Sequence, residues 1–192
     1  LSSGWVKKAF VKKIFPDSVD IMLEEFSPAI VVNSKTSGRD DNEKNFYTLW
    51  FADENGHVFK RAFPGEATAK LPFFHISYDS LSEKMRGKRI KTAVKIAAEW
   101  AKEPSRCKIR SIKYDFASGF SADCEADDSM TAFISFGRKL DDEQIVEMKE
   151  KFSKISSGLE LENKWAGEYI FEKSESDGRI RVVVGKVFKN VT

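Results

Sequence analysis

The sequence has few of the residues from which catalytic and metal sites are built. Its 192 residues include only two cysteines, Cys107 and Cys124, and only two histidines, His57 and His75. No CxxC pair or Cys/His cluster offers the thiolates and imidazoles that zinc requires. A glycine-rich phosphate loop and a Gly-x-Ser-x-Gly nucleophile motif are also missing. We therefore expect no metal, no cofactor and no enzymatic activity.

Long apolar segments and an excess of one charge are missing as well. The longest apolar runs, such as Ala29–Val32, fall far short of the ~20 residues of a membrane-spanning helix. The chain begins with Leu1 and has no signal-peptide pattern, so we interpret it as a fragment or processed form of a longer protein. Its 32 basic and 30 acidic residues nearly cancel, which argues against a dedicated nucleic-acid-binding protein.

A β-hairpin is predicted over residues 5–26. Val19, Ile21 and Leu23 recur at every second position, which is typical of a half-buried strand. A Phe-Pro-Asp-Ser run precedes this strand, and these residues favour a turn. The wholly polar residues 33–45 that follow the hairpin predict a flexible loop.

The rest of the chain alternates strands with two helices. Apolar residues at helical spacing predict amphipathic helices over 86–102 and 142–156. Asp141 and Gln144 resemble a capping box before the second helix, and Gly158 is its predicted C′ residue. An Asn-Gly turn with positive φ predicts a second hairpin. The strands predicted after residue 45 are 46–51, 57–59, 108–116, 120–124, 130–136, 168–173 and 179–188. We expect an α+β fold with an antiparallel β domain and flanking helices.

The predicted strand pairing separates the two cysteines. If the turn at 117–119 pairs Phe116 with Phe120, Cys124 lies opposite Ile112. Cys107 is then ~17 Å away along the strand. A disulfide requires Cα atoms within ~7 Å, so we expect no bond between the two.

The first predicted hairpin carries a more specific pattern. It reads Trp5–Val11, then Phe15–Asp17, then the alternating strand Ile21–Glu25, then Pro28. This pattern resembles the last two strands of a POTRA domain in the FtsQ/DivIB family of bacterial cell-division proteins.

The order of the later elements resembles the second, β domain of the same family. Leu49–Phe51 with Val58-Phe59 resembles its first hairpin, and Leu71-Pro72 resembles the short segment after it. The two predicted helices, the strands between them and the final strand pair follow in the same order. The resemblance implies that residues 1–32 are the C-terminal part of a POTRA domain and that residues 33–192 are an FtsQ-like β domain.

The resemblance also implies a function and a location. Members of the family are non-catalytic scaffolds of the cell-division machinery. They bind division proteins of the FtsB and FtsL type and link them to septal peptidoglycan synthesis. They cross the inner membrane once and place their bulk in the periplasm. Contact of this chain with the membrane would run only through an upstream helix outside its sequence.

The expected partner-binding surface is the final strand pair, to which the resemblance assigns FtsB binding by β-strand addition. A last strand at a sheet edge leaves backbone groups unpaired, and a partner strand can pair with them. Aromatic side chains would anchor the partner, and basic side chains would meet its acidic residues. Alternatively, the basic residues only protect the edge from aggregation. In the family an acidic residue often stands where this chain has Phe171. The expected binding residues are Tyr169, Phe171, Lys173, Arg179, Arg181 and Val183.

Other interpretations stay open at this point. The chain could be another POTRA-containing protein of envelope assembly or secretion. It could also be a periplasmic ligand-binding protein or enzyme with a pocket near His75. The basic segment Lys84–Lys95 could contact nucleic acid or anionic lipid, but we favour the solvated face of the first helix, since the overall charge is balanced.

Overall fold

The computed structural model describes most of the chain. The described residues are 4–36, 46–63, 65, 66, 68, 70–77, 83–102, 108–125, 131–138, 140–160, 168–173 and 180–185. In chain order the elements are β1 (Val6–Ile14), β2 (Ser18–Glu25), β3 (Ile30–Thr36), β4 (Phe46–Ala52), β5 (Val58–Arg61), β6 (Phe73–Ser77), α1 (Glu83–Ala101), β7 (Lys108–Asp115), β8 (Gly119–Glu125), β9 (Thr131–Gly137), α2 (Asp142–Glu160), β10 (Glu168–Lys173) and β11 (Ile180–Val184). The predicted α+β class is confirmed.

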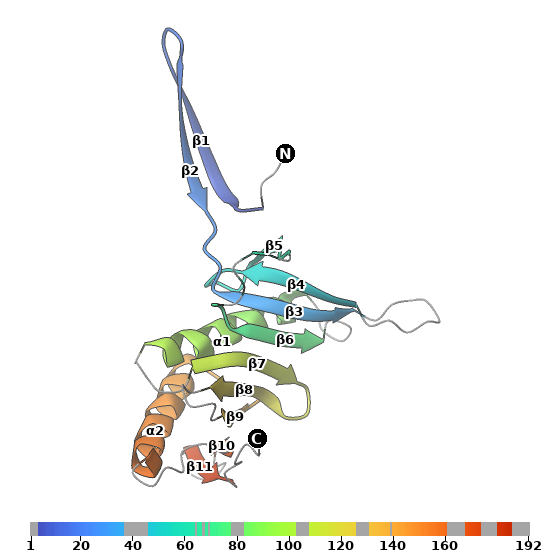
Figure 1. Ribbon diagram of the computed structural model, residues 1–192, viewed down its shortest axis with the longest axis vertical. Helices are drawn as coiled ribbons and strands as arrows, with labels where there is room; N and C mark the ends of the chain where they lie inside the picture. Colours follow the sequence, from blue (N-terminus) through green and yellow to red (C-terminus); the bar gives the residue numbers. More distant parts are fainter. Residues whose placement is uncertain are drawn as a thin grey trace, which may run out of the picture.

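A mixed sheet of nine strands forms the larger part of the fold (Figure 1). Its strand order is β11-β10-β9-β8-β7-β6-β3-β4-β5. The expectation of an antiparallel sheet is wrong for three ladders, because β3–β6, β6–β7 and β9–β10 are parallel. Two of them follow from the connections, since α1 joins β6 to β7 and α2 joins β9 to β10. A parallel pair needs a crossover of this length. The interior strand β6 was not predicted from the sequence.

Both helices pack against the same face of the sheet. Trp100 of α1 contacts Phe136 of β9 and Phe152 of α2, with ring centroids 5.2 and 6.2 Å apart. The predicted apolar stripes are confirmed at Ile90, Val94, Ile145, Met148 and Phe152, all of which are buried. No helix in the described part of the chain is long and apolar enough to cross a membrane.

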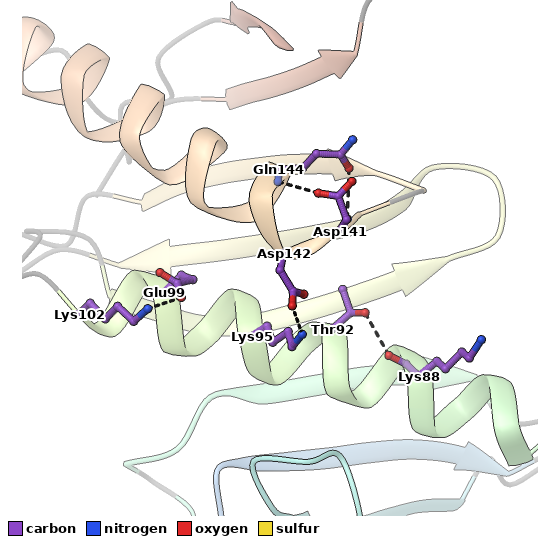
Figure 2. A network of polar contacts seen from close by, with 8 residues as sticks. All are labelled: Lys88, Thr92, Lys95, Glu99, Lys102, Asp141, Asp142 and Gln144. Atoms are coloured by element: carbon purple, nitrogen blue, oxygen red, sulfur yellow. Dashed lines mark hydrogen bonds and ion pairs between the residues drawn. The ribbon is translucent and has the colours of Figure 1, made fainter. Parts of the chain in front are cut away.

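Polar contacts fix the start of α2 against α1 (Figure 2). The predicted capping box is confirmed, because the Gln144 N–H donates to Asp141 Oδ1 at 2.8 Å and the Asp141 N–H donates to Gln144 Oε1 at 3.2 Å. Lys95 of α1 forms an ion pair with Asp142. Gly158 is not the C′ residue, since α2 continues to Glu160.

The β1–β2 hairpin projects away from the large sheet (Figure 1). The hairpin itself is confirmed, but the expected burial of one face is wrong. Val19, Ile21 and Leu23 are 57%, 59% and 53% exposed, and Phe10 and Val11 of β1 are exposed too. No element in the described residues covers either face of this two-stranded sheet, so its apolar side chains face solvent.

An aromatic cluster attaches the base of the hairpin to the large sheet. Trp5 contacts Phe51 and Phe59, with ring centroids 5.3 and 5.7 Å apart. Phe26 stacks on Phe59 at 4.6 Å. The expected domain boundary after residue 32 falls inside β3, and residues 33–36 of the predicted loop are strand. Residues 37–45 of that loop lie outside the described residues.

The expectation that the cysteines are unbonded is wrong, because Cys124 is disulfide-bonded. The chain's only other cysteine is Cys107, which lies outside the described residues. The predicted register was in error. Asp115 pairs with Gly119, and an irregularity follows further along the ladder, so Cys124 lies opposite Ile109 rather than Ile112.

Reduction of the disulfide should lower the free energy of unfolding by about 2–4 kcal/mol, because a crosslink restricts the unfolded chain. Urea unfolding with and without reductant measures this difference. The double variant Cys107→Ala/Cys124→Ala is the control, and its stability should be low in both conditions. An unfolding midpoint of the parent protein that is the same with and without reductant would contradict the crosslink.

Candidate functional site

The strand β11 forms one edge of the nine-stranded sheet. It pairs with β10 on one side, and no described strand pairs with its other side. Ile180 is buried and Val182 is partly buried, whereas Val183 and Val184 are 48% and 41% exposed. An edge of this kind presents backbone donors and acceptors that no neighbouring strand pairs, although the Ile180 carbonyl accepts from Lys151 of α2. The position expected for strand addition is therefore an edge among the described residues.

Two of the predicted binding residues are core residues instead. Tyr169 and Phe171 of β10 are 0% and 3% exposed. Tyr169 packs edge-on against Phe152 of α2 at 4.9 Å, and Phe171 stacks on Phe136 of β9 at 6.2 Å. The expectation that these rings contact a partner is wrong, because β10 is an interior strand and both rings face the helices.

The other predicted binding residues are only partly placed by the structure. Val183 is exposed on β11, as expected. The backbones of Lys173 and Arg181 belong to β10 and β11, but their side chains lie outside the described part. Arg179 also lies outside it. The structure therefore places Val183 on β11 at the open edge. That the three basic residues contact a partner stays a prediction from the sequence.

His75 lies on the sheet face that the helices do not cover. Asn33 Nδ2 is 3.2 Å from His75 Nδ1. The pKa of His75 is lowered by burial and by the charge of Lys113. Ser111 donates to Asp123 Oδ2 at 2.6 Å, and Lys113 forms an ion pair with the same oxygen at 2.8 Å. The Ser111 hydroxyl is thus bonded to a carboxylate rather than to the imidazole, so these residues do not form a nucleophile–base pair.

The Asp123 carboxylate stays ionised because Lys113 and Ser111 bond to it. Burial raises the pKa of Asp123, but hydrogen bonds from Lys113 and Ser111 outweigh that effect and lower the pKa overall. Within the described residues, no group of three or more His, Cys, Asp or Glu side chains could hold a metal ion.

A groove between α1 and the β3–β4–β5 end of the sheet is a second candidate site. Its volume is about 840 Å³, within the size range of small-ligand pockets. Trp50, Val58 and Ile90 line it with apolar surface. Lys84, Lys88 and Lys91 of α1 line it as well, and all three are exposed. The balanced charge of the sequence favoured a solvated helix face for these lysines. The sequence does not indicate the groove, because Trp50 and Val58 come from strands far away in the chain.

Two glycines shape this groove in different ways. Gly56 has a φ of 79°, as the Asn-Gly turn predicted, and a Cβ there would lie 2.7 Å from the backbone nitrogen of Lys91. Its turn therefore approaches α1 closely. Gly87 sits inside α1, and a Cβ there would meet no atom within 4 Å. Packing therefore does not require a glycine at position 87. A glycine inside a helix also destabilises it, so an alanine there would be more stable.

Comparison with known proteins adds no assignment. No protein-family model matches the sequence, and no curated protein is significantly similar to it.

Stability at alkaline pH should depend on Tyr169. Burial raises the pKa of Tyr169 from 10.0 to about 12, so the folded protein keeps a proton that the unfolded chain loses earlier. Its contribution to the free energy of unfolding is fully present below pH 10. It falls by about 1.4 kcal/mol per pH unit as the pH rises to about 12. Chemical denaturation across this range should show a steeper loss for the parent protein than for Tyr169→Phe. Parallel curves would contradict the burial of a neutral phenol.

Replacing Gly87 by Ala should raise the free energy of unfolding by about 0.5–1 kcal/mol, because alanine fits the open space and favours the helix. Gly56→Ala should have the opposite effect, because its φ is positive and its Cβ would collide with α1. Thermal unfolding of both variants measures whether each change raises or lowers the free energy of unfolding. A loss of stability in Gly87→Ala would mean that the space beside Gly87 is filled.

Proposed function

We propose that this chain is the extracytoplasmic part of a bacterial cell-division scaffold resembling FtsQ/DivIB, and that it binds partner proteins without catalysis. The observation that carries the proposal is the open edge of β11 at the end of a nine-stranded sheet. Backbone pairing along such an edge supplies affinity, and alternate side chains supply specificity. The exposed Val183 and Val184 are the side chains available for that contact.

The partners that fit this edge are division proteins of the FtsB and FtsL type. A partner segment would add as a strand beside β11 and continue the sheet. Lys173, Arg179 and Arg181 are the basic residues of this strand pair that would meet acidic residues in the partner. Through these partners the scaffold would influence septal peptidoglycan synthesis.

The hairpin agrees with the proposed POTRA origin of the N-terminal segment. β1 and β2 pair through the Phe-Pro-Asp turn on which the resemblance rests. Val11, Ile21 and Leu23 form an apolar face, as in a strand pair of a small domain with its own core. We propose that β1 and β2 are the last two strands of such a domain.

The proposed location is the periplasmic side of the inner membrane, with a single membrane helix upstream of this sequence. The disulfide at Cys124 supports an extracytoplasmic location. Disulfides persist in oxidising compartments such as the bacterial periplasm and are rare in the reducing cytosol.

Proline substitutions in β11 test the strand-addition surface. Backbone N–H groups of adjacent strand residues point to opposite sides, so either Val183→Pro or Val184→Pro removes a donor from the open edge. That variant should keep its melting temperature and bind the FtsB-type protein of the same genome at least about tenfold more weakly. Circular dichroism and a binding titration measure the two properties.

The matched charge test is Arg181→Glu against Lys84→Glu. The first should weaken binding of the FtsB-type protein, and the second, on the distant helix α1, should leave it unchanged. The proposed surface would be wrong if both prolines and Arg181→Glu bound this partner as tightly as the parent chain while remaining folded.

A further inference from the structure

We propose that the groove between α1 and the β3–β4–β5 end of the sheet binds an extended acidic peptide that carries one apolar side chain. This site lies apart from β11, and it does not depend on the division function proposed above.

The floor of the groove suits an apolar side chain. Trp50 and Val58 are only partly buried, and together with the buried Ile90 they offer apolar surface inside a concavity of about 840 Å³. Such a surface gains free energy when an apolar group displaces water from it. The helix layer does not fill this region, although Trp50 and Val58 also pack against the main core.

The rim of the groove is positively charged. Lys84, Lys88 and Lys91 follow one another at the four- and three-residue spacing that places side chains on one face of a helix. Among the described residues, no carboxylate forms an ion pair with any of the three. The only carboxylate among the described lining residues is Glu83, at the N-terminal end of the helix.

The C-terminal half of the same helix differs in this respect. There Lys95 pairs with Asp142 of α2, and Glu99 pairs with Lys102, the residue after the helix (Figure 2). Figure 2 also shows that the Lys88 side chain points toward none of the other residues drawn. Its backbone carbonyl accepts a hydrogen bond from the Thr92 hydroxyl at 3.0 Å. On α1, the ammonium groups that lack a carboxylate partner among the described residues therefore lie beside the groove, where they would attract carboxylates.

Gly87 keeps this part of the groove open. It lies between Lys84 and Lys88 on the helix, where a side chain would enter unoccupied space. No packing contact requires a glycine at this position. We infer that Gly87 instead keeps the groove beside it free of a side chain. A larger side chain at this position is predicted to block the ligand without breaking the helix.

The spread of the charges favours a peptide over a compact anion. Lys84 and Lys91 are separated by ~10 Å along the helix axis. An extended peptide advances ~3.3 Å per residue, so carboxylates on several residues can meet them in turn. A single phosphate would need donors that converge on one point, and a membrane surface would not enter a concave groove.

A binding titration with the whole chain tests the proposal. The probe is a labelled synthetic peptide in which glutamates and serines flank a central leucine. We expect binding that weakens with added salt, as interactions of exposed charges do. Lys88→Glu/Lys91→Glu and Gly87→Leu should each weaken it at least about tenfold. Lys154→Glu, an exposed site on α2, should match the parent chain.

Two control peptides and two competitors separate the outcomes. Replacing the glutamates by glutamines, or the leucine by serine, should each abolish most of the binding. Inorganic phosphate and vesicles of anionic phospholipid should not compete at matched ionic strength. The proposal is overturned if the groove variants bind like the parent chain, if the glutamine peptide binds equally well, or if phosphate or vesicles displace the probe.

Discussion

The contact of Trp100 with Phe136 and Phe152 joins α1, the sheet and α2 in one core. Aromatic contacts of this kind stabilise a fold beyond the area that they bury, by about 0.5–1.5 kcal/mol each. Because both helices are crossovers between parallel strands, their burial on one face also holds β6 beside β7 and β9 beside β10. The mixed order of the sheet therefore depends on this single helix layer.

The surfaces available for binding follow from where that layer ends. The helix layer leaves a groove beside β4 and β5 at one end of the sheet. At the other end Lys151 of α2 donates to the Ile180 carbonyl, and no described strand pairs with the outer side of β11. The two sites are at opposite ends of the strand order. An interaction at one end can thus be changed by mutation without altering the other.

Local features of this fold could be predicted from the sequence, whereas features set by distant contacts could not. The capping box of Asp141 and Gln144 depends only on neighbouring residues, and it forms as predicted. The alternation in β10 indicates that Tyr169 and Phe171 share one side of a strand, but not whether a helix covers that side. The pattern of β2 likewise predicts an apolar face without stating what packs on it. The groove was missed because the lysines and Trp50 meet only in the folded chain.

The placement of β3 beside β6 has a further consequence for how the chain folds. Asn33 and His75, neighbours across that ladder, are 42 residues apart in the sequence. By contrast, β7, β8 and β9 pair with the strands next to them in the chain. Closing a long loop costs more conformational entropy than closing a short one, and non-local pairing slows folding. The β7–β8–β9 meander can therefore form early, whereas the pairing of β3 with β6, like the other two parallel pairings, requires a long loop to close.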